Sequence, residues 1–147
     1  MYSLYRNPDL DDRIYDCLLT STAAVQAEDV RASFLFVGDL NGHHQEWLGS
    51  TTTNSHGAAA FNFATVSGCD QLVVGPTHAR DGILDLLMTD VPDLIRVAVV
   101  APIGNSDHRI AVCNTWSSGG TALCRVGGVT SQLDLPYLTP LSVAGCG

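Results

Sequence analysis

The chain contains no lysine, and its seven positively charged side chains, all arginine, are opposed by fifteen acidic residues. The formal net charge of -8 is therefore opposite to the basic surface with which proteins neutralise nucleic-acid phosphates. A bound divalent cation reverses the local sign of an acidic site, so a metal-dependent phosphoesterase is compatible with this composition. The charge argues against a nucleic-acid binder that relies on a basic surface alone.

Long apolar runs are also missing, and none of the runs present could span a bilayer. The first residues, Met1 to Ser3, begin nothing like a signal peptide, so we expect an intracellular protein without a membrane partner. The five cysteines are odd in number, widely scattered and without a CxxC pair. This argues against a zinc site and a disulfide framework, and each cysteine is expected to be a small buried apolar residue.

The length of 147 residues and the hydrophobic content of 46% suit one domain with a substantial core. Apolar runs predict short strands, and apolar residues near helical spacing predict two helices. Strands alternating with helices indicate an α/β layered fold. The strands are expected at Tyr2–Arg6, Phe34–Val37, Leu72–Val74, Ile83–Met88, Leu94–Val100 and Ile110–Cys113, and the helices at Asp11–Ala27 and His56–Val66.

The most informative stretch is FLFVGDLNGHHQEW, residues 34–47. Its apolar run ends at Gly38 and predicts a strand buried on both faces. A carboxylate, an amide and two imidazoles follow directly after this strand. Functional side chains often lie at such positions, in loops held by a rigid element. An Asx turn explains GDLN by itself. The polar residues in question are Asp39, Asn41, His43 and His44.

A carboxylate, Asp85, interrupts the apolar run Ile83–Met88. A buried carboxylate must be paired, and His108, at the end of the cluster GNSDH, is a suitable partner. Such a pair would fix the tautomer of the imidazole and bring Asp39 and Asp107 toward one edge of the sheet. Clustered carboxylates suit Mg²⁺ or Mn²⁺, and a metal with an oriented histidine can hydrolyse a phosphodiester.

The order GDxN, a threonine loop, LD on a strand and SDH resembles the endonuclease/exonuclease/phosphatase superfamily. It is most similar to the apurinic-type endonuclease domain of non-LTR retrotransposon polyproteins. The resemblance covers residues 1–113 and implies the C-terminal portion of a four-layer α/β sandwich, two packed sheets flanked by helices. Residues 114–147 match nothing in the pattern and are expected to form a divergent, weakly ordered tail. The matching motifs are Gly38-Asp39-Leu40-Asn41, Pro76-Thr77, Leu84-Asp85 and Ser106-Asp107-His108.

The resemblance implies a role for each matching residue. Asp39 would orient or deprotonate the attacking water, and Asn41 would hold that water or the phosphate. Asp107 would be the metal-side carboxylate, while His108, supported by Asp85, would stabilise charge on the scissile phosphate. Substrate contacts are expected from Tyr5, Arg6, His44 and Thr77, although an exposed arginine without a role and a turn threonine are equally good interpretations of Arg6 and Thr77.

The family's N-terminal half supplies an early asparagine and the glutamate that principally binds the metal, and neither is found in this sequence. We therefore expect a fragment with low or no activity alone, whose partners are DNA and either the missing half-domain or a reverse transcriptase domain. A nuclear location is expected. Three functions stay open: a Mg²⁺-dependent DNA endonuclease, a phosphoesterase acting on lipid or small-molecule esters, and a non-catalytic α/β interaction module.

Overall fold

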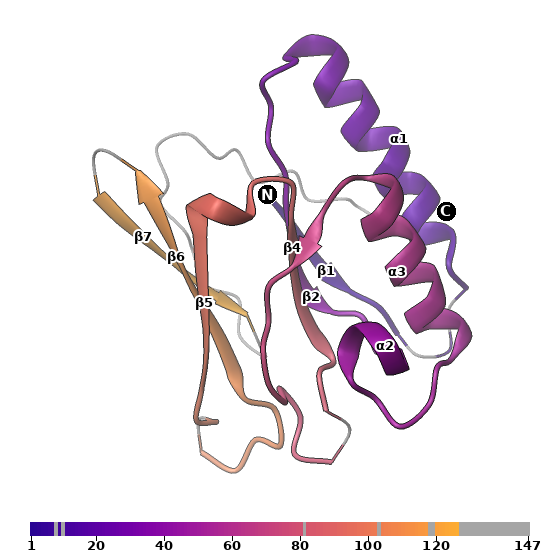
Figure 1. The fold of residues 1–147 in the computed structure, drawn as a ribbon, viewed down its shortest axis with the longest axis vertical. Coiled ribbons are helices and arrows are strands. Elements are labelled where there is room, and N and C mark those ends of the chain that lie inside the picture. Colours follow the sequence, from indigo (N-terminus) through magenta and orange to yellow (C-terminus); the bar gives the residue numbers. More distant parts are fainter. Residues whose placement is uncertain (8, 10, 81, 103, 118–119, 127–147) are drawn as a thin grey trace.

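The computed structural model describes residues 1–7, 9, 11–80, 82–102, 104–117 and 120–126 (Figure 1). Helices and strands form a mixed α/β fold, as the sequence predicts. No helix within these ranges is long and apolar enough to cross a bilayer. In chain order the elements are β1 (Tyr2–Tyr5), α1 (Arg13–Glu28), β2 (Leu35–Asp39), α2 (Gln45–Leu48), α3 (Ser55–Val66), β3 (Asp70–Gln71), β4 (Asp85–Thr89), the 3-10 turn η1 (Pro92–Leu94), β5 (Ile95–Val100), β6 (Ile110–Ser117) and β7 (Gly120–Val126).

Four strands form a mixed sheet in the order β1-β2-β4-β3. The central strand β2 runs parallel to β1 and antiparallel to β4. Its first four residues are all buried, which confirms the strand covered on both faces that the apolar run predicts. Because β2 lies in the middle of the sheet, its end at Asp39 is held from both sides.

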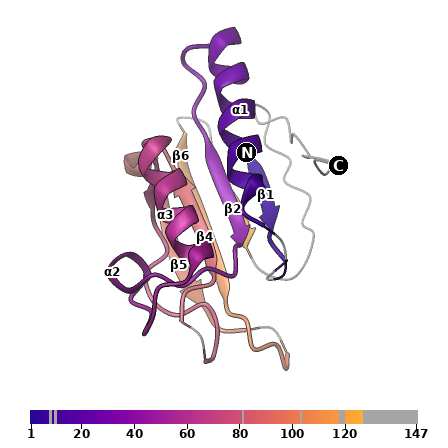
Figure 2. The same ribbon diagram turned by 90° about the vertical axis from the view of Figure 1, so that its right-hand side faces the viewer.

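Helices α1 and α3 cover one face of this sheet (Figures 1 and 2). Aromatic side chains fill the space between: the Tyr2 and Phe36 rings stack 5.1 Å apart, and Phe63 of α3 meets Phe36 edge-on at 5.1 Å. Offset and edge-on aromatic pairs stabilise cores beyond the area that they bury. This cluster fixes β2 against the helices and so holds the end of the strand rigidly.

The other face of the mixed sheet packs against a second, antiparallel sheet, ordered β5-β6-β7. Val37 and Leu87 point to this side and form a second buried cluster with Ile95 of β5. The molecule therefore has three layers in the described residues: helices, mixed sheet and antiparallel sheet, which Figure 2 shows from the side.

Gly38 lies where β1 and β2 approach closely. A Cβ atom at this position would lie only 1.8 Å from the carbonyl oxygen of Leu4. Only glycine fits there, because the backbone of the neighbouring strand occupies the place of any side chain. The glycine of the GDLN motif is thus required by the sheet itself.

Several element boundaries differ from the predicted ones. The brief strand expected at Leu72–Val74 is instead β3, two residues earlier, although the Leu72 amide still bonds to Leu87. Helix α3 begins at Ser55, one residue before the predicted start at His56, and the side chain of Asn54 accepts a hydrogen bond from the amide of Gly57. Helix α2 was not predicted, since four residues show no helical period.

The predicted domain boundary after Cys113 falls inside β6, and β7 follows it. These strands occupy the start of the stretch in which the sequence shows no sustained periodicity. The rest of the predicted tail, residues 127–147, lies outside the described residues. Among the cysteines, Cys69 is buried and free as expected, whereas Cys17 is disulfide-bonded, which corrects the expectation of five free thiols.

Candidate active site

Two carboxylates meet at one end of the mixed sheet. Asp39 ends β2 and Asp85 begins β4, and the two residues are register partners in the antiparallel ladder. Asp85 is only 2% exposed, and Asp39 is partly buried. Burial raises the pKa of Asp39, the backbone N–H of Asn41 acts in the opposite direction, and the nearby charge of Asp85 raises it further. Asp39 therefore holds a proton more readily than an exposed aspartate.

Asp85 also contacts His108, as the interrupted apolar strand predicts. The imidazole Nδ1 lies 3.1 Å from Asp85 Oδ2. The Nδ1–H donates to the carboxylate, which leaves Nε2 directed elsewhere as the second donor of the charged ring. Burial alone would lower the pKa of His108, but the hydrogen bond and charge of Asp85 raise it above its ordinary value. The ring is thus an oriented imidazole that favours its cationic form.

Thr77 brings these two residues together. Its side-chain hydroxyl accepts the backbone N–H groups of Leu84 and Asp85, both at 3.0 Å. Its backbone carbonyl accepts the N–H of Arg109 at 2.6 Å, which draws the segment after His108 toward β4. Thr77 is completely buried, so its position favours the turn interpretation over a substrate contact.

Asn41 is held in an unusual backbone conformation beside Asp39. Its φ of 49° lies in the left-handed region, which asparagine tolerates better than most residues. Its N–H bonds to Asp39 Oδ1 at 3.1 Å, and its side-chain Nδ2 donates to the carbonyl of Arg6 at 2.9 Å. This second bond fixes the amide plane and places Asn41 next to the Asp39 carboxylate.

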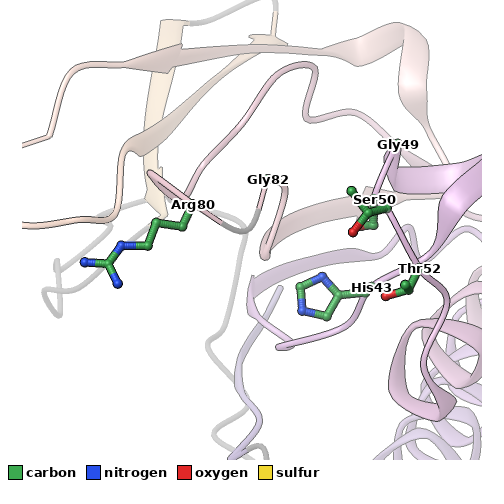
Figure 3. Close-up of a pocket in the computed structure, with 7 residues that line it drawn as sticks. His43, Gly49, Ser50, Thr52, Arg80 and Gly82 are labelled. Carbon is green, nitrogen blue, oxygen red and sulfur yellow. The ribbon is translucent and has the colours of Figure 1, made fainter.

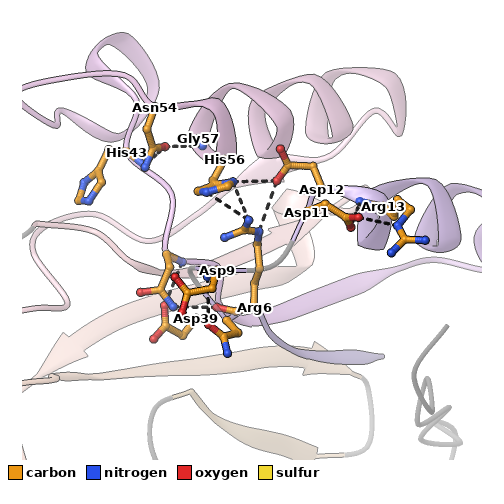
Figure 4. A network of polar contacts seen from close by, with 12 residues as sticks. Arg6, Asp9, Asp11, Asp12, Arg13, Asp39, His43, Asn54, His56 and Gly57 are labelled. Carbon is orange, nitrogen blue, oxygen red and sulfur yellow. Dashed lines mark hydrogen bonds and ion pairs between the residues drawn. The ribbon is translucent and has the colours of Figure 1, made fainter. Parts of the chain in front are cut away.

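The two predicted contacts from β1 have different surroundings. Tyr5, the register partner of Asp39, is 71% exposed and open to a ligand. Arg6 is only 1% exposed, with its Nη2 2.6 Å from His56 Nδ1 and its Nε 3.3 Å from Asp12. Figure 4 shows its side chain extending toward that pair. The arginine is therefore held in a buried network, which corrects the interpretation of Arg6 as an exposed side chain, while its phosphate contact stays a prediction.

Asp12 lies beside Arg6 and His56 at the start of α1. It stands at the N-cap position of α1 but makes no side-chain capping hydrogen bond. Its carboxylate instead contacts His56 at 3.0 Å as well as Arg6.

His44, predicted as a substrate contact, caps α2 by accepting the N–H of Trp47 at Nδ1, and its ring packs 4.8 Å from Phe61. Its placement is that of a capping residue.

Asp107 lies close to His78, a histidine that none of the matching motifs includes. His78 Nε2 is 3.2 Å from Asp107 Oδ2, and the rings of His78 and His108 are 4.8 Å apart. An isolated bridge joins the backbones of the two histidines. The sequence signal that could have revealed His78 is its place directly after Thr77 in the motif loop. The hydrogen bond to His78 is the main reason why the pKa of Asp107 lies below its usual value.

Among the described residues, two overlapping groups of side chains could hold a divalent cation. In Asp39, Asp85 and His108, and equally in His78, Asp107 and His108, one ligand atom per residue lies within 4.8 Å of the others. Mg²⁺ is usually bound by one or two carboxylates and keeps several waters, which fits this donor set without an all-protein cage. Carboxylate oxygens suit Mn²⁺ as well.

A surface pocket of about 360 Å³ opens between the loop after α2 and the loop that carries Arg80. In Figure 3, His43, Ser50 and Thr52 lie on one side and Arg80 and Gly82 on the other. Hydroxyls, an imidazole and a guanidinium are groups that bind phosphate and sugar oxygens. The Arg80 N–H donates to His78 Nδ1, which connects this wall of the pocket with the residues around Asp107.

Comparisons with known proteins concern the fold and the family of this chain. One solved structure with the same fold is titled "Endonuclease domain of TRAS1, a telomere-specific non-LTR retrotransposon", with a TM-score of 0.61 and 22% identity. The match covers 80% of this chain and 56% of that one, so the chain spans little more than half of that structure. A comparison with curated proteins gives no significant match.

A family model described as "Endonuclease-reverse transcriptase" matches residues 1–112, about three quarters of the chain. The matched range contains every residue of the candidate site, from Tyr5 to His108. The family that the four ordered motifs predict is thereby confirmed. The chain belongs to the endonuclease-reverse transcriptase family.

Proposed function

We propose that this chain is the C-terminal portion of a metal-dependent endonuclease domain that nicks DNA by hydrolysing a phosphodiester bond. The observation that carries the proposal is the contact of His108 with Asp85, beside Asp39 at one end of the sheet. Phosphodiester hydrolysis needs a group that takes a proton from water and a cationic group that faces the phosphate. Asp39 and the oriented imidazole of His108 are groups of these two kinds at one end of the sheet. Family membership supports the same reaction class.

In this proposal each residue has one task. Asp39, whose pKa is raised, takes the proton of the attacking water, and Asn41 holds that water or the phosphate. His108 donates from Nε2 to a phosphate oxygen as negative charge develops, and Asp85 keeps the ring in place. Asp107 lies on the metal side, and exposed Tyr5 contacts a phosphate. A bound Mg²⁺ or Mn²⁺ would supply charge stabilisation beside these residues.

The net charge of -8 makes the route of the DNA a specific question. We propose that the strand passes over the pocket between His43 and Arg80, because this pocket adjoins the loop that carries His78. Hydroxyls of Ser50 to Thr52 would bind the backbone there without a basic patch.

The three observed layers support the proposal that the whole domain is a four-layer sandwich of which this chain forms the C-terminal portion. The chain spans 56% of the similar solved structure, and no glutamate of the described residues joins either candidate cation group. We therefore propose that full activity requires the N-terminal half of the domain, and that a reverse transcriptase domain is a further partner. The chain alone should be weakly active.

Nicking of a supercoiled plasmid in Mg²⁺ tests the function. We expect slow relaxation by the unmodified protein and a loss of about 10²-fold or more in Asp107→Ala and His108→Ala. Asp11→Ala is the matched control, because Asp11 is exposed and pairs only with the neighbouring Arg13 among the contacts described. Equal traces from all four proteins would overturn the enzyme proposal. Release of phosphate from inositol or lipid esters without nicking would indicate the phosphoesterase instead.

A further inference from the structure

We infer that His78 is a positioning residue that orients the Asp107 carboxylate toward the divalent cation, an inference that rests on the proposed function. Asp107 by itself is poorly placed for this task. Its side chain is 70% exposed, and an exposed carboxylate samples several rotamers. Something must restrain it if it is to meet a cation in one geometry.

His78 is fixed where Asp107 is not. Its side chain is only 10% exposed. Its backbone N–H donates to the carbonyl of Gly82 at 2.9 Å, and isolated bridges join it to both Gly82 and His108. The N–H of the next residue, Ala79, bonds to the carbonyl of Asp107 at 3.0 Å. The imidazole and the backbone of Asp107 therefore belong to one rigid unit.

The ring is also oriented to donate. Nδ1 accepts the N–H of Arg80 at 3.2 Å, which places the ring proton on Nε2. Nε2 faces Asp107 Oδ2 at 3.2 Å. A histidine whose far nitrogen is engaged by the backbone is the usual means by which proteins fix a ring in one orientation. One carboxylate oxygen is thus held by His78, and the other stays available for a cation.

The position of the ring relates this restraint to the reacting groups. The His78 and His108 rings meet at 4.8 Å with an angle of 70° between their planes. Asp107 is consequently held on the same side as the imidazole that would face the phosphate. If His78 instead bound the cation directly through Nε2, that nitrogen would have to lose its proton. The proton would then lie on Nδ1, and the backbone N–H of Arg80 would lose its hydrogen-bond acceptor. The hydrogen bonds therefore favour positioning over ligation.

Binding of Mn²⁺ to the full chain, followed by electron paramagnetic resonance or calorimetry without DNA, tests the inference. His78→Ala should weaken Mn²⁺ binding about tenfold or more, the effect usual for a group that orients a metal ligand. His78→Gln should restore most of the affinity, because its amide nitrogen stands where Nε2 stood. His78→Asn should not, because its shorter side chain cannot reach. Thermal unfolding of each variant separates this effect from a loss of the fold.

A second measurement needs no metal. The ¹⁵N chemical shifts of the His78 ring should report a proton on Nε2 and none on Nδ1. Asp107→Ala should change the chemical shift of Nε2 alone. Unchanged Mn²⁺ affinity in His78→Ala, with binding reduced in Asp107→Asn, would overturn the positioning role and leave the proposed function standing. An equal loss in His78→Gln and His78→Ala would replace positioning by direct ligation. A wild-type chain that binds no Mn²⁺ would overturn the positioning role, because the Asp107 carboxylate would then have no cation to meet.

Discussion

Asp39 and Asp85 are register partners on neighbouring antiparallel strands, so two carboxylates that are 46 positions apart in the chain occupy the same end of one sheet. Burial and the nearby charge of Asp85 raise the pKa of Asp39, and His108 acts in the opposite direction. The result is a coupled group in which the aspartate tends to hold a proton and the imidazole tends to be charged. The first tendency follows mainly from burial, and the second follows from the contact of His108 with Asp85.

The His108 contact should make stability depend on pH. Its pKa is higher in the folded chain than in the unfolded one, so its contribution is complete below about pH 6.5, the ordinary histidine value, and is lost as the pH rises through the folded-state pKa. The difference in free energy of unfolding between wild type and His108→Gln should therefore shrink between pH 5.5 and 9. Urea unfolding at four pH values measures it. A difference that stays constant or grows would contradict the raised pKa.

Replacing Thr77 with valine should destabilise the fold and separate the two halves of the site. The hydroxyl accepts hydrogen bonds from two backbone N–H groups in a fully buried position. Valine has a similar shape but no hydrogen-bond acceptor. Each unsatisfied buried group costs about 1–3 kcal/mol. Thr77→Ser keeps the acceptor and is the matched control. Equal midpoints of chemical unfolding for the valine and serine variants would show that these hydrogen bonds matter little.

Gly57→Ala tests how helix α3 supports the loop after β2. A Cβ atom there would lie 1.9 Å from the carbonyl oxygen of His43, so the loop must move. We expect a loss of about 1–3 kcal/mol in spite of the better helix propensity of alanine. Gly68→Ala, at a φ of 64° with open space around it, should cost about 1 kcal/mol from backbone strain alone. A smaller loss at Gly57 than at Gly68 would contradict the close packing of the loop.

Local patterns in the sequence predict the elements whose periodicity is strong. The run before Gly38 predicts the central strand, and a charge inside an apolar strand predicts the partner of Asp85. In both cases burial restricts the possibilities, because a wholly apolar run must be covered on both faces and a buried carboxylate must be paired. The roles of the site residues in catalysis stay predictions, since proximity alone does not test them.

The remaining features depend on contacts between distant segments. His78 meets Asp107 because loops 29 residues apart are joined by backbone bridges, and no spacing rule reveals this. Arg6 is buried because a helix end and a histidine 50 residues away surround it. Single residues carry no signal of such neighbours, so the sequence suggests only an exposed or phosphate-binding arginine.

Arg80 is the cation most directly placed to test the route of the DNA. It lines the pocket beside His43, and its exposed side chain belongs to the loop of His78. Arg80→Ala should weaken DNA binding equally for all sequences and reduce the slope of log affinity against log salt by about 1. Arg31→Ala, which is exposed beside Asp29 at the far end of α1, is the matched control. Equal salt slopes for wild type and Arg80→Ala would remove this pocket from the proposed path.

The buried guanidinium of Arg6 predicts a contrast between two neighbouring aspartates. Asp12 is one-third exposed and pairs with Arg6, which is almost fully buried, whereas Asp11 pairs with Arg13 on the open surface. Asp12→Ala removes an anionic partner of this buried charge and should cost about 3 kcal/mol, the lower end of the range for breaking buried pairs because Asp12 meets solvent. Asp11→Ala should lower the unfolding midpoint much less, since it removes an exposed pair and one exposed hydrogen bond from the Arg13 N–H. Because Arg6 also donates its backbone N–H to the carbonyl of Asp39, loss of its anchor should loosen Asn41 and reduce nicking in Asp12→Ala alone. Unfolding and nicking that change equally in both variants would mean that the Arg6 network does not support the site.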